Sequence, residues 1–440
     1  MKRISVLGLG YIGLPTAILA AQAGYEVCGY DIDQEKVKQI NAGNPVIFEP
    51  EISDRLWKAL QGGFFKAAHE LQYADCFVIA VPTPFKEGNR ADLTYVFQAA
   101  EAIAKRLMPG NLVILESTVP VGTTEQVAQC LAKNSDLILG KDFFVSHAPE
   151  RVLPGRIFKE LVENDRVVGG ICQQACRLTQ LFYSKFVKGF IHVTDDKSAE
   201  MIKLIENASR DVQIALANQV ASMCKAANLD PYHVIELANK HPRVKLLTPT
   251  CGVGGHCIAV DPWFLIETFP AETQLLQVAR AINDEKPLTI LKQVLERCAE
   301  LQRNNIARPK IFVMGLAFKP DVDDVRQSPA LQIANALQTH PDALELKVYD
   351  HNVPLSVLQK YDFDIASDVW RGIAWADMVL VLVKHKEFSL MHQDVFCGKV
   401  VIDTCGLLYE MQSRQSRAIL EGATRVDTPF WKTGVMKDLA

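Results

Sequence analysis

Residues 3–13, with the sequence RISVLGLGYIG, decide the fold of the first part of the chain. They predict an apolar strand, a turn made by three glycines and the start of a helix that runs to about residue 23. A second strand is predicted at residues 26–30. A strand, a glycine turn, a helix and a second strand form a βαβ unit, from which doubly wound α/β domains are built.

The glycine turn also predicts a cofactor. Gly8, Gly10 and Gly13 allow backbone N–H groups at the helix start to approach a pyrophosphate. Asp31 closes the second strand, where a carboxylate can accept hydrogen bonds from a ribose diol and repels a 2′-phosphate. The alternative is an ordinary glycine-rich turn. Because the strand, the helix and the acid are all in place, the sequence favours a site for NAD over NADP.

The remaining apolar patterns predict two further domains. Three domains of about 150 residues fit a chain of 440 residues: an NAD-binding domain at 1–195, a central helical domain at 196–302 and a second α/β domain at 303–440. The central domain contains one long helix at 197–228, a stretch without Gly or Pro. Further parallel strands are predicted at 76–81, 112–116, 143–147, 310–314, 346–349, 378–383 and 399–403. The predicted fold class is α/β, with two doubly wound Rossmann-like domains joined by a helical domain.

Composition argues against several classes of function. Lys and Arg total 47 and Asp and Glu total 51, and the net charge of −4 gives no bulk attraction to nucleic acid or to an anionic membrane. The 11 cysteines are odd in number and form no CxxC pair, which favours reduced thiols in a cytoplasmic protein without a metal site. Residues 4–21 carry no charge and imitate a secretory leader, but their glycines and Pro15 predict a strand, a turn and a buried helix.

Two groups of residues in the central part suggest catalysis. Residues 252–257, GVGGHC, place three glycines before Cys257, so that its thiol can lie exposed beside backbone N–H groups. Lys203 and Asn207 share one face of the long helix, where an ammonium and an amide can hold an oxyanion or a water molecule. The alternatives are a buried structural cysteine and a solvated polar stripe. His256 is expected to be structural.

Three loops follow predicted strands, at the edge where open α/β sheets bind ligands: residues 116–124, 148–151 and 315–320. Turn formation and helix capping are the alternative uses of their Ser and Thr residues. Residues 315–320 lack the third glycine of a dinucleotide site, so a second NAD is not expected there.

The chain as a whole resembles the nucleotide-sugar 6-dehydrogenases of the UDP-glucose/GDP-mannose dehydrogenase family. The motifs that carry the resemblance cover almost the whole chain, in this order: residues 8–15, 81–84, 117–124, 149–151, 203–207, 252–261, 318–319 and 324–326. Within the family, residues 150–155, 241–244 and 254–264 are most similar to the branch that acts on UDP-N-acetyl-D-mannosamine. UDP-N-acetylglucosamine and UDP-glucose are the alternative substrates.

The resemblance implies a four-electron oxidation, in which the C6 alcohol of the sugar becomes a carboxylate and two NAD are reduced. Cys257 would add to the aldehyde as a nucleophile, and the resulting thiohemiacetal would be oxidised to a thioester and hydrolysed. Lys203 and Asn207 would stabilise the oxyanion. Thr118 and Asp261 would position a water molecule, and Glu150 would assist proton transfer.

The resemblance also implies binding residues and an assembly. The NAD contacts would come from Gly8, Gly10, Tyr11, Ile12, Gly13, Asp31, Pro82, Thr83 and Thr118. The UDP-sugar contacts would come from Glu150, Arg151, Lys203, Arg243, Gly254, Phe318, Lys319 and Arg326. Because Arg243 would reach the sugar of a neighbouring subunit, a homodimer or a larger homo-oligomer is expected. The product would serve the synthesis of surface polysaccharide precursors.

Two other classes of protein fit parts of the same pattern. A single-step β-hydroxyacid dehydrogenase also joins an NAD domain to a long helix with Lys and Asn, but it would release one NADH per substrate. A non-catalytic NAD-binding protein would form no NADH. Cys257 in its glycine loop and the second α/β domain favour the two-step oxidation.

Overall fold

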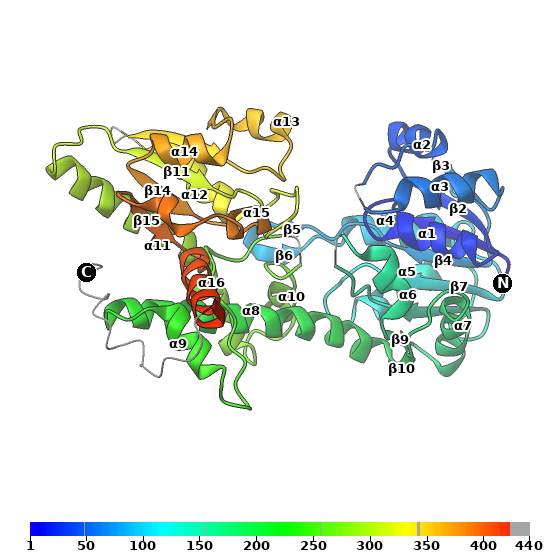
Figure 1. The fold of residues 1–440 in the computed structure, drawn as a ribbon. Coiled ribbons are helices and arrows are strands. Elements are labelled where there is room, and N and C mark those ends of the chain that lie inside the picture. Colours follow the sequence, from blue (N-terminus) through cyan, green and yellow to red (C-terminus); the bar gives the residue numbers. More distant parts are fainter. Residues whose placement is uncertain (48, 154, 256, 341–343, 423–440) are drawn as a thin grey trace. The chain divides into compact units, whose positions relative to one another are not determined.

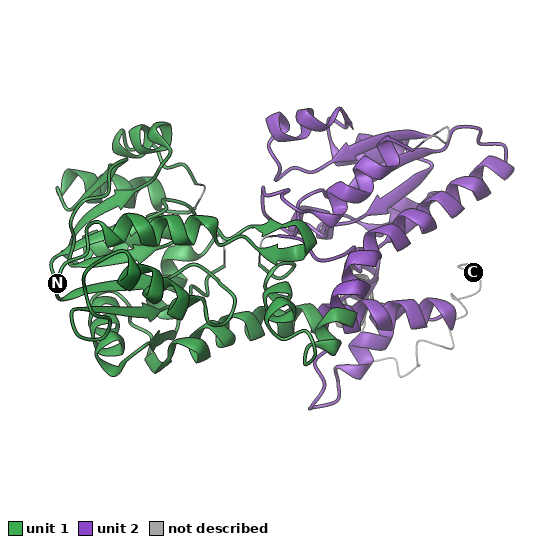
Figure 2. Ribbon diagram, turned by 180° about the vertical axis from the view of Figure 1, so that it is seen from behind, with its two compact units in different colours: residues 1–212, 257–278 green, residues 213–256, 279–440 purple. Residues whose placement is uncertain are grey.

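The computed structural model describes residues 1–47, 49–153, 155–255, 257–340 and 344–422. The chain divides into two compact units, one of residues 1–212 and 257–278 and the other of residues 213–256 and 279–440 (Figure 2). The two longest helices, α8 (Asp196–Ala226) and α11 (Gln274–Arg303), each contribute residues to both units. His256, at the end of the glycine loop, lies outside the described residues.

The first unit contains an eight-stranded sheet in the order β10-β9-β8-β7-β4-β1-β2-β3 (Figure 1). Its strands are β1 (Arg3–Leu7), β2 (Glu26–Tyr30), β3 (Phe65–Ala68), β4 (Cys76–Ile79), β7 (Asn111–Leu115), β8 (Phe143–His147), β9 (Arg166–Gly170) and β10 (Ile191–Asp195). The five strands predicted from the sequence are present and parallel to one another. The strands β3, β9 and β10 were not predicted.

The sheet departs from the parallel arrangement at one pairing, because β9, a strand that was not predicted, pairs with β8 in the antiparallel sense. The described residues of the connection between them form one short helix, α6 (Ile157–Glu163), and the connection begins and ends at the carboxyl edge of the sheet. An antiparallel neighbour needs no crossover to the opposite edge. As a result β9 starts at the edge where β8 ends, and its first residue, Arg166, lies there with the segment that follows β8.

Helices cover both faces of this sheet, and the central strand β4 is therefore apolar at every position. In β4, Cys76 and Val78 face one core cluster, whereas Phe77 and Ile79 face the other. This alternation is the two-residue period of a strand buried on both sides. The helices before α8 are α1 (Gly13–Gln22), α2 (Gln34–Asn41), α3 (Ile52–Gln61), α4 (Thr94–Ala104), α5 (Thr123–Lys133), α6 and α7 (Gln173–Tyr183).

Residues 4–21, which imitate a leader, form β1, the glycine turn and most of α1, as predicted. All but one residue of α1 are buried. Among the described residues, no helix has the length and apolar character needed to cross a membrane.

The central helices confirm the predicted long helix, which ends two residues earlier than expected. After α8 the chain forms α9 (Pro231–Ala238), α10 (Asp261–Thr268) and α11. The described residues of 241–260 are turns and loop rather than helix, because Pro242, Pro249 and the three glycines of 252–255 interrupt any helical pattern.

The second unit contains a five-stranded parallel sheet in the order β13-β12-β11-β14-β15. Its strands are β11 (Lys310–Met314), β12 (Glu345–Tyr349), β13 (Asp364–Ile365), β14 (Met378–Val381) and β15 (Val400–Asp403). The prediction missed only the two-residue strand β13. The helices beside this sheet are α12 (Pro329–Gln338), α13 (Leu355–Leu358), α14 (Val369–Trp375), α15 (Lys386–Ser389) and α16 (Leu407–Gly422).

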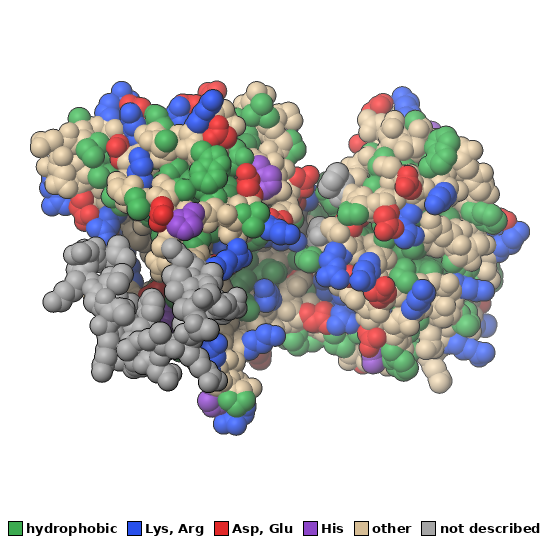
Figure 3. Space-filling model, viewed as in Figure 1, with side chains coloured by type: hydrophobic (Ala, Val, Ile, Leu, Met, Phe, Trp, Pro, Cys, Tyr) green, Lys and Arg blue, Asp and Glu red, His purple; other side chains and the backbone are tan. Residues whose placement is uncertain are grey.

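Charged side chains of both signs are interspersed over the face of each unit drawn in Figure 3. This distribution accords with the small net charge of −4.

Candidate active site

Helix α8 carries one end of the candidate catalytic cluster in the first unit. Lys203 and Asn207 lie one turn apart on this helix, as predicted from their spacing. An apolar cluster formed with α10 holds the helix in place; its members include Leu204, Ala208, Phe264 and Leu265. This packing brings the amino end of α10 to the polar face of α8.

Asp261, the first residue of α10, completes this contact. Its Oδ2 accepts a hydrogen bond of 2.5 Å from the Nδ2 of Asn207. Asp261 is 3% exposed, and burial raises the pKa of its carboxyl to about 6, against the opposing effects of the Lys203 charge and the Asn207 hydrogen bond. The group is therefore mostly ionised at neutral pH, although it can take up a proton at mildly acidic pH.

Cys257 lies one helical turn before Asp261. Its carbonyl accepts hydrogen bonds from the backbone N–H groups of Val260, at 3.0 Å, and Asp261, at 2.9 Å. Of the eleven cysteines, Cys257 and Cys397 are the two exposed ones. The structure therefore places an accessible thiol at the start of the helix that carries Asp261, and the alternative of a buried structural cysteine is wrong.

Glu150 lies in the segment that follows β8 and is buried. Burial raises the pKa of its carboxyl to about 7, against the lowering effects of the Lys203 and Arg166 charges. Its Oε1 accepts a hydrogen bond from the N–H of Arg151. A cavity of about 10 Å³, enough for one water molecule, is lined by residues that include Glu150, Arg151 and Arg166. Such a carboxyl can exchange a proton near neutral pH.

A buried ion pair that the sequence did not predict supports this segment. Arg166 pairs with Glu116, and it also donates a hydrogen bond of 3.2 Å to the carbonyl of Ala148. Glu116 accepts further hydrogen bonds from the hydroxyls of Thr16 and Tyr183, both at 3.1 Å. The guanidinium of Arg166 lies 3.8 Å from the centre of the Tyr183 ring. The network ties the carboxyl ends of β7 and β8 to the first residue of β9.

His147, the last residue of β8, is fully buried next to this network. Neither of its ring nitrogens has a hydrogen-bond partner among the described residues. Burial lowers its pKa to about 3, and the charges of Arg166 and Lys203 act in the same direction. The imidazole is therefore neutral at physiological pH.

The loop that contains Thr118 is anchored to α8 by Glu200, another residue that the prediction missed. Glu200 accepts hydrogen bonds from Gly122 N at 2.6 Å and from the N–H and hydroxyl of Thr124 at 2.7 and 2.6 Å. The carbonyl of Thr118 accepts a hydrogen bond of 2.8 Å from the hydroxyl of Thr83. Thr83 and Thr118, both predicted to contact NAD, are thus direct neighbours.

The glycine turn has the geometry that a dinucleotide requires. Gly8 has φ +91°, and a Cβ at Gly13 would lie 1.8 Å from the Gly8 carbonyl oxygen. A Cβ at Gly10 would meet nothing within 4 Å, so its backbone is open to a ligand. Asp31 accepts hydrogen bonds from Leu9 N and Lys36 Nζ, both at 2.9 Å. Tyr11 and Ile12 are partly buried at the start of α1, Pro82 is exposed after β4, and all these residues fit an NAD site.

In the second unit, the predicted substrate residues come from two segments that pack together. The loop 315–328 after β11 carries Phe318, Lys319 and Arg326. A Cβ at Gly254 would lie 2.6 Å from the carbonyl oxygen of Gln327, so only glycine allows the backbone this close to the loop. The Nζ of Lys319 lies 5.5 Å from the centre of the Phe318 ring.

The three arginines predicted to bind substrate each form hydrogen bonds or ion pairs within the protein. Arg326 donates three side-chain hydrogen bonds of 2.7 to 3.1 Å to the carboxylate of Asp324. Arg151 forms a two-point ion pair with Glu206 of α8 in the first unit. Arg243 is exposed in the turn after α9, where its N–H donates to the ring of His241.

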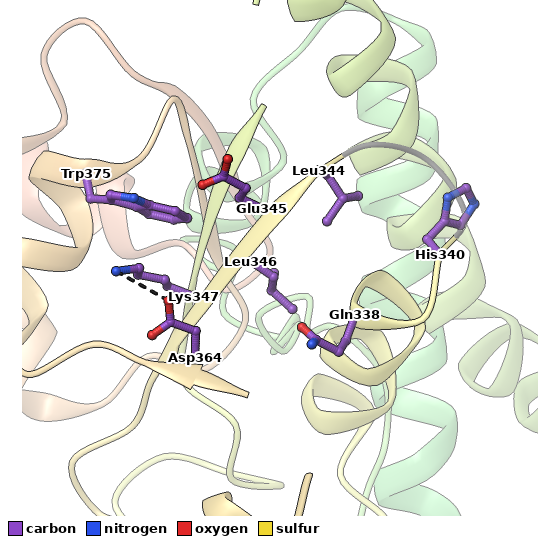
Figure 4. Close-up of a pocket in the computed structure, with 8 residues that line it drawn as sticks. All are labelled: Gln338, His340, Leu344, Glu345, Leu346, Lys347, Asp364 and Trp375. Atoms are coloured by element: carbon purple, nitrogen blue, oxygen red, sulfur yellow. Dashed lines mark ion pairs between the residues drawn. The ribbon is translucent and has the colours of Figure 1, made fainter. Parts of the chain in front are cut away.

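A larger cavity in the second unit, of about 340 Å³, was not predicted (Figure 4). It lies beside the first residues of β12 and includes the ion pair of Lys347 with Asp364, at 3.4 Å, next to the ring of Trp375. Ligands of open α/β sheets bind at the carboxyl ends of strands rather than at their starts. Among the described residues, no group of three His, Cys, Asp or Glu side chains is arranged to hold a metal ion.

Comparison with known proteins accounts for the three parts of the chain. Three models of the UDP-glucose/GDP-mannose dehydrogenase family match it: the NAD binding domain at residues 2–187, the central domain at 197–285 and the UDP binding domain at 312–410.

Individual relatives match over most of their length. The chain is 44% identical to a UDP-N-acetyl-D-mannosamine dehydrogenase of Campylobacter jejuni, over 89% of this chain and 98% of the relative. It is 42% identical to an NDP-N-acetyl-D-galactosaminuronic acid dehydrogenase of Ralstonia nicotianae, over 92% and 96%. The structure of a UDP-D-ManNAc dehydrogenase from Pyrococcus horikoshii matches with a TM-score of 0.83 at 41% identity, over 92% and 96%. The chain belongs to the UDP-glucose/GDP-mannose dehydrogenase family and is an NAD-dependent nucleotide-sugar dehydrogenase.

Proposed function

We propose that this protein oxidises the C6 alcohol of UDP-N-acetyl-D-mannosamine to a carboxylate and reduces two NAD in doing so. The observation that carries the proposal is the position of an exposed thiol, Cys257, one turn before the buried carboxyl of Asp261, which is bonded to Asn207. A second oxidation needs a nucleophile at the aldehyde carbon, and this arrangement supplies one. The similarity to UDP-N-acetyl-D-mannosamine dehydrogenases supports the choice of sugar.

In the first oxidation, the C6 hydroxyl loses a proton and a hydride to become an aldehyde. NAD, when bound, accepts the hydride in this oxidation and in the second one. Lys203 and Asn207 lie on one face of α8 and stabilise the oxyanion that develops at O6. Lys203 is buried and Asn207 is half-buried, and this burial strengthens the interaction because water screens it less.

In the second oxidation, the thiolate of Cys257 forms a C–S bond to the aldehyde carbon, and the carbonyl oxygen takes up a proton. Loss of a proton and a second hydride from this thiohemiacetal gives a thioester. A water molecule then forms the new C–O bond, the C–S bond breaks, and the thiol is regenerated. With its pKa near 7, Glu150 accepts the proton of this water, while Asp261 and Thr118 orient it.

Binding of the UDP moiety is assigned to the second unit. The family model that matches residues 312–410 is that of a UDP binding domain, and the loop with Phe318, Lys319 and Arg326 follows its first strand. Two cationic side chains in this loop suit a diphosphate. We place the enzyme in the cytoplasm as a homodimer, in which Arg243 reaches the sugar of the neighbouring subunit, and its product in the synthesis of surface polysaccharide precursors.

The proposal is tested by the number of NADH formed per sugar nucleotide consumed. UDP-N-acetyl-D-mannosamine, UDP-N-acetylglucosamine, UDP-glucose, UDP-N-acetylgalactosamine and GDP-mannose are compared side by side. We expect two NADH per UDP-N-acetyl-D-mannosamine and the highest kcat/KM for this sugar. One NADH per sugar contradicts the thioester mechanism, and no NADH with any sugar indicates a binding protein.

A second candidate substrate is an N-acetylgalactosamine derivative, because a relative of 42% identity is named for N-acetyl-D-galactosaminuronic acid. The two sugars differ in configuration at the ring carbons and not at C6, so the same catalytic cluster would serve either. A higher kcat/KM with UDP-N-acetylgalactosamine would select this alternative.

A further inference from the structure

The glycine turn of the first unit has a counterpart in the second. Gly8 N donates a hydrogen bond of 2.8 Å to Tyr30 O, and Gly315 N donates one of 2.9 Å to Tyr349 O. Both glycines have positive φ, +91° and +87°. The residue after each tyrosine is an aspartate, so Asp350 takes the place in the second sheet that Asp31 takes in the first.

The two aspartates have different surroundings. Asp31 is the acid expected to bind a ribose, and it receives one backbone N–H from the glycine turn, that of Leu9. Asp350 receives two, from Leu316 at 2.7 Å and Ala317 at 3.0 Å. Its other oxygen accepts the N–H groups of Asn352 and Val353. The carboxylate of Asp350 is thus surrounded by donors from its own chain.

His385 supplies the last of these donors. Its Nε2 lies 3.0 Å from Asp350 Oδ2, and both side chains are completely buried. The ring packs edge-on against Phe388, at 5.3 Å between centres. A pair buried in this way is held in one geometry, because neither partner can turn to water.

The other ring nitrogen fixes the tautomer of His385. Its Nδ1 lies 3.0 Å from the backbone N–H of Asp321 and 2.8 Å from the Nδ2 of Asn352. Two donors at Nδ1 require this nitrogen to accept, so the proton lies on Nε2 and points at Asp350. The neighbouring N–H of Lys386 donates to Asp321 Oδ1 at 2.9 Å and gives the same loop a second attachment.

We propose that His385 is a positioning residue for the sugar nucleotide: it ties the loop 315–328, through Asp321 and Asp350, to the end of β14. The loop carries Phe318 and Lys319 just before Asp321, and Arg326 five residues after it. With its oxygens occupied, Asp350 serves as an anchor for this loop and is not available to a ribose. The inference rests on the proposed function, in that this loop is taken to bind UDP.

The test is a calorimetric titration of the full-length protein with UDP, which needs no turnover. In His385→Gln the amide can still donate to Asp350, but nothing replaces the Nδ1 acceptor of Asp321 N. In His385→Asn the side-chain oxygen replaces this acceptor, and the donor to Asp350 is lost. We expect UDP affinity to fall about tenfold in His385→Gln and by less than about threefold in His385→Asn, since an unpaired buried N–H is the larger loss.

A purely structural histidine would give a different result. It would lower the melting temperature in both variants and leave UDP affinity unchanged in the folded fraction, and this result overturns the proposal. We also expect the KM for the sugar nucleotide to rise in His385→Gln and the KM for NAD to stay the same. His392→Gln, at an exposed histidine of the same unit, is the matched control and should bind UDP as the wild type does.

Two further variants keep the test decisive. If His385→Gln does not fold, Asp321→Gly suits the positive φ of 59° at this position and removes the acceptor of the Lys386 N–H, and unchanged UDP affinity then overturns the proposal that anchoring at Asp321 positions the loop. Lys319→Ala distinguishes the role of His385 from the assignment of the loop 315–328 to UDP binding. Weaker UDP binding in Lys319→Ala with wild-type binding in His385→Gln overturns the role of His385 alone, whereas unchanged binding in both overturns the assignment of the loop to UDP.

Discussion

The side chains of Asn207 and Asp261 meet at 2.5 Å, although 54 residues separate them in sequence. Asn207 belongs to α8 and Asp261 begins α10, so this hydrogen bond fixes the amino end of one helix against the polar face of the other. The Cys257 carbonyl is hydrogen-bonded to the Asp261 N–H, so the contact also fixes the turn that carries the thiol. The position of the proposed nucleophile therefore depends on a carboxyl that burial disfavours in its ionised form.

Asp261→Asn is expected to separate activity from stability. The new amide can still accept from Asn207, and removal of a buried charge leaves the melting temperature at pH 8 equal or higher. Loss of the carboxylate that orients water should lower kcat by roughly 100-fold. NADH formation and thermal unfolding check the two parts. Glu267→Gln, at an exposed position of the same helix, is the control, and a kcat of Asp261→Asn within about twofold of the wild type would contradict the role.

Cys257→Ser is expected to stop the second oxidation. A hydroxyl at this place is a far weaker nucleophile than a thiolate, so steady-state NADH formation should fall by roughly 1000-fold or more. Mass spectrometry of the wild type during turnover should detect a thioester on the peptide with Cys257, and this adduct should be absent in the variant. Cys397→Ser, at the other exposed cysteine, is the control. Undiminished turnover in Cys257→Ser rules out the covalent mechanism.

The pKa of Glu150, about 7, predicts the acid side of the pH profile. A base must be ionised to accept a proton, so log kcat should rise with pH below about 7 and level off above it. In Glu150→Gln this limb should vanish and kcat should fall by roughly 100-fold at pH 8. Rates measured from pH 5.5 to 9 test this, and an unchanged limb in the variant would assign the titration to another group.

Glu150 also predicts a pH-dependent change in stability. Its folded pKa lies above the value of about 4.3 in an unfolded chain, so the folded protein holds this proton more tightly. The contribution is present at low pH and is lost as pH rises through about 7. As the pH rises from 5.5 to 8, the melting temperature of the wild type should therefore fall relative to that of Glu150→Gln. A constant difference across this range would contradict the raised pKa.

The parts of the fold that the sequence predicted depend on local signals. The two-sided apolar runs of β4 and β7 and the glycine turn after β1 are such signals, as is the absence of Gly and Pro from α8. No local signal predicts the direction of β9, because this direction follows from a connection that begins and ends at the same edge of the sheet. Two-residue strands such as β13 are too short for a period to appear.

In the candidate site too, features with a local sequence signal were predicted and contacts between distant segments were not. The helix spacing of Lys203 and Asn207 was readable, and the resemblance to a family added Asp261 and Glu150. The ion pair of Arg166 with Glu116 joins residues 50 positions apart, and no sequence motif predicts it. The same holds for His385, whose partner Asp350 lies 35 residues earlier. Contacts between distant segments depend on how the elements pack, which a single sequence does not encode in any local pattern.

Replacement of Gly10 or Gly13, the last two glycines of the NAD turn, by alanine is expected to have different effects on stability and on NAD binding. A Cβ at Gly13 would lie 1.8 Å from the Gly8 carbonyl oxygen, so Gly13→Ala must shift the backbone and should cost at least about 2 kcal/mol of stability. A Cβ at Gly10 meets no protein atom within 4 Å, so Gly10→Ala should fold normally. Because that space is where a pyrophosphate approaches the backbone, the KM for NAD should rise in Gly10→Ala while the KM for the sugar nucleotide stays constant. Thermal unfolding and steady-state kinetics test both variants. An unchanged KM for NAD in Gly10→Ala would contradict the placement of the NAD pyrophosphate at this turn.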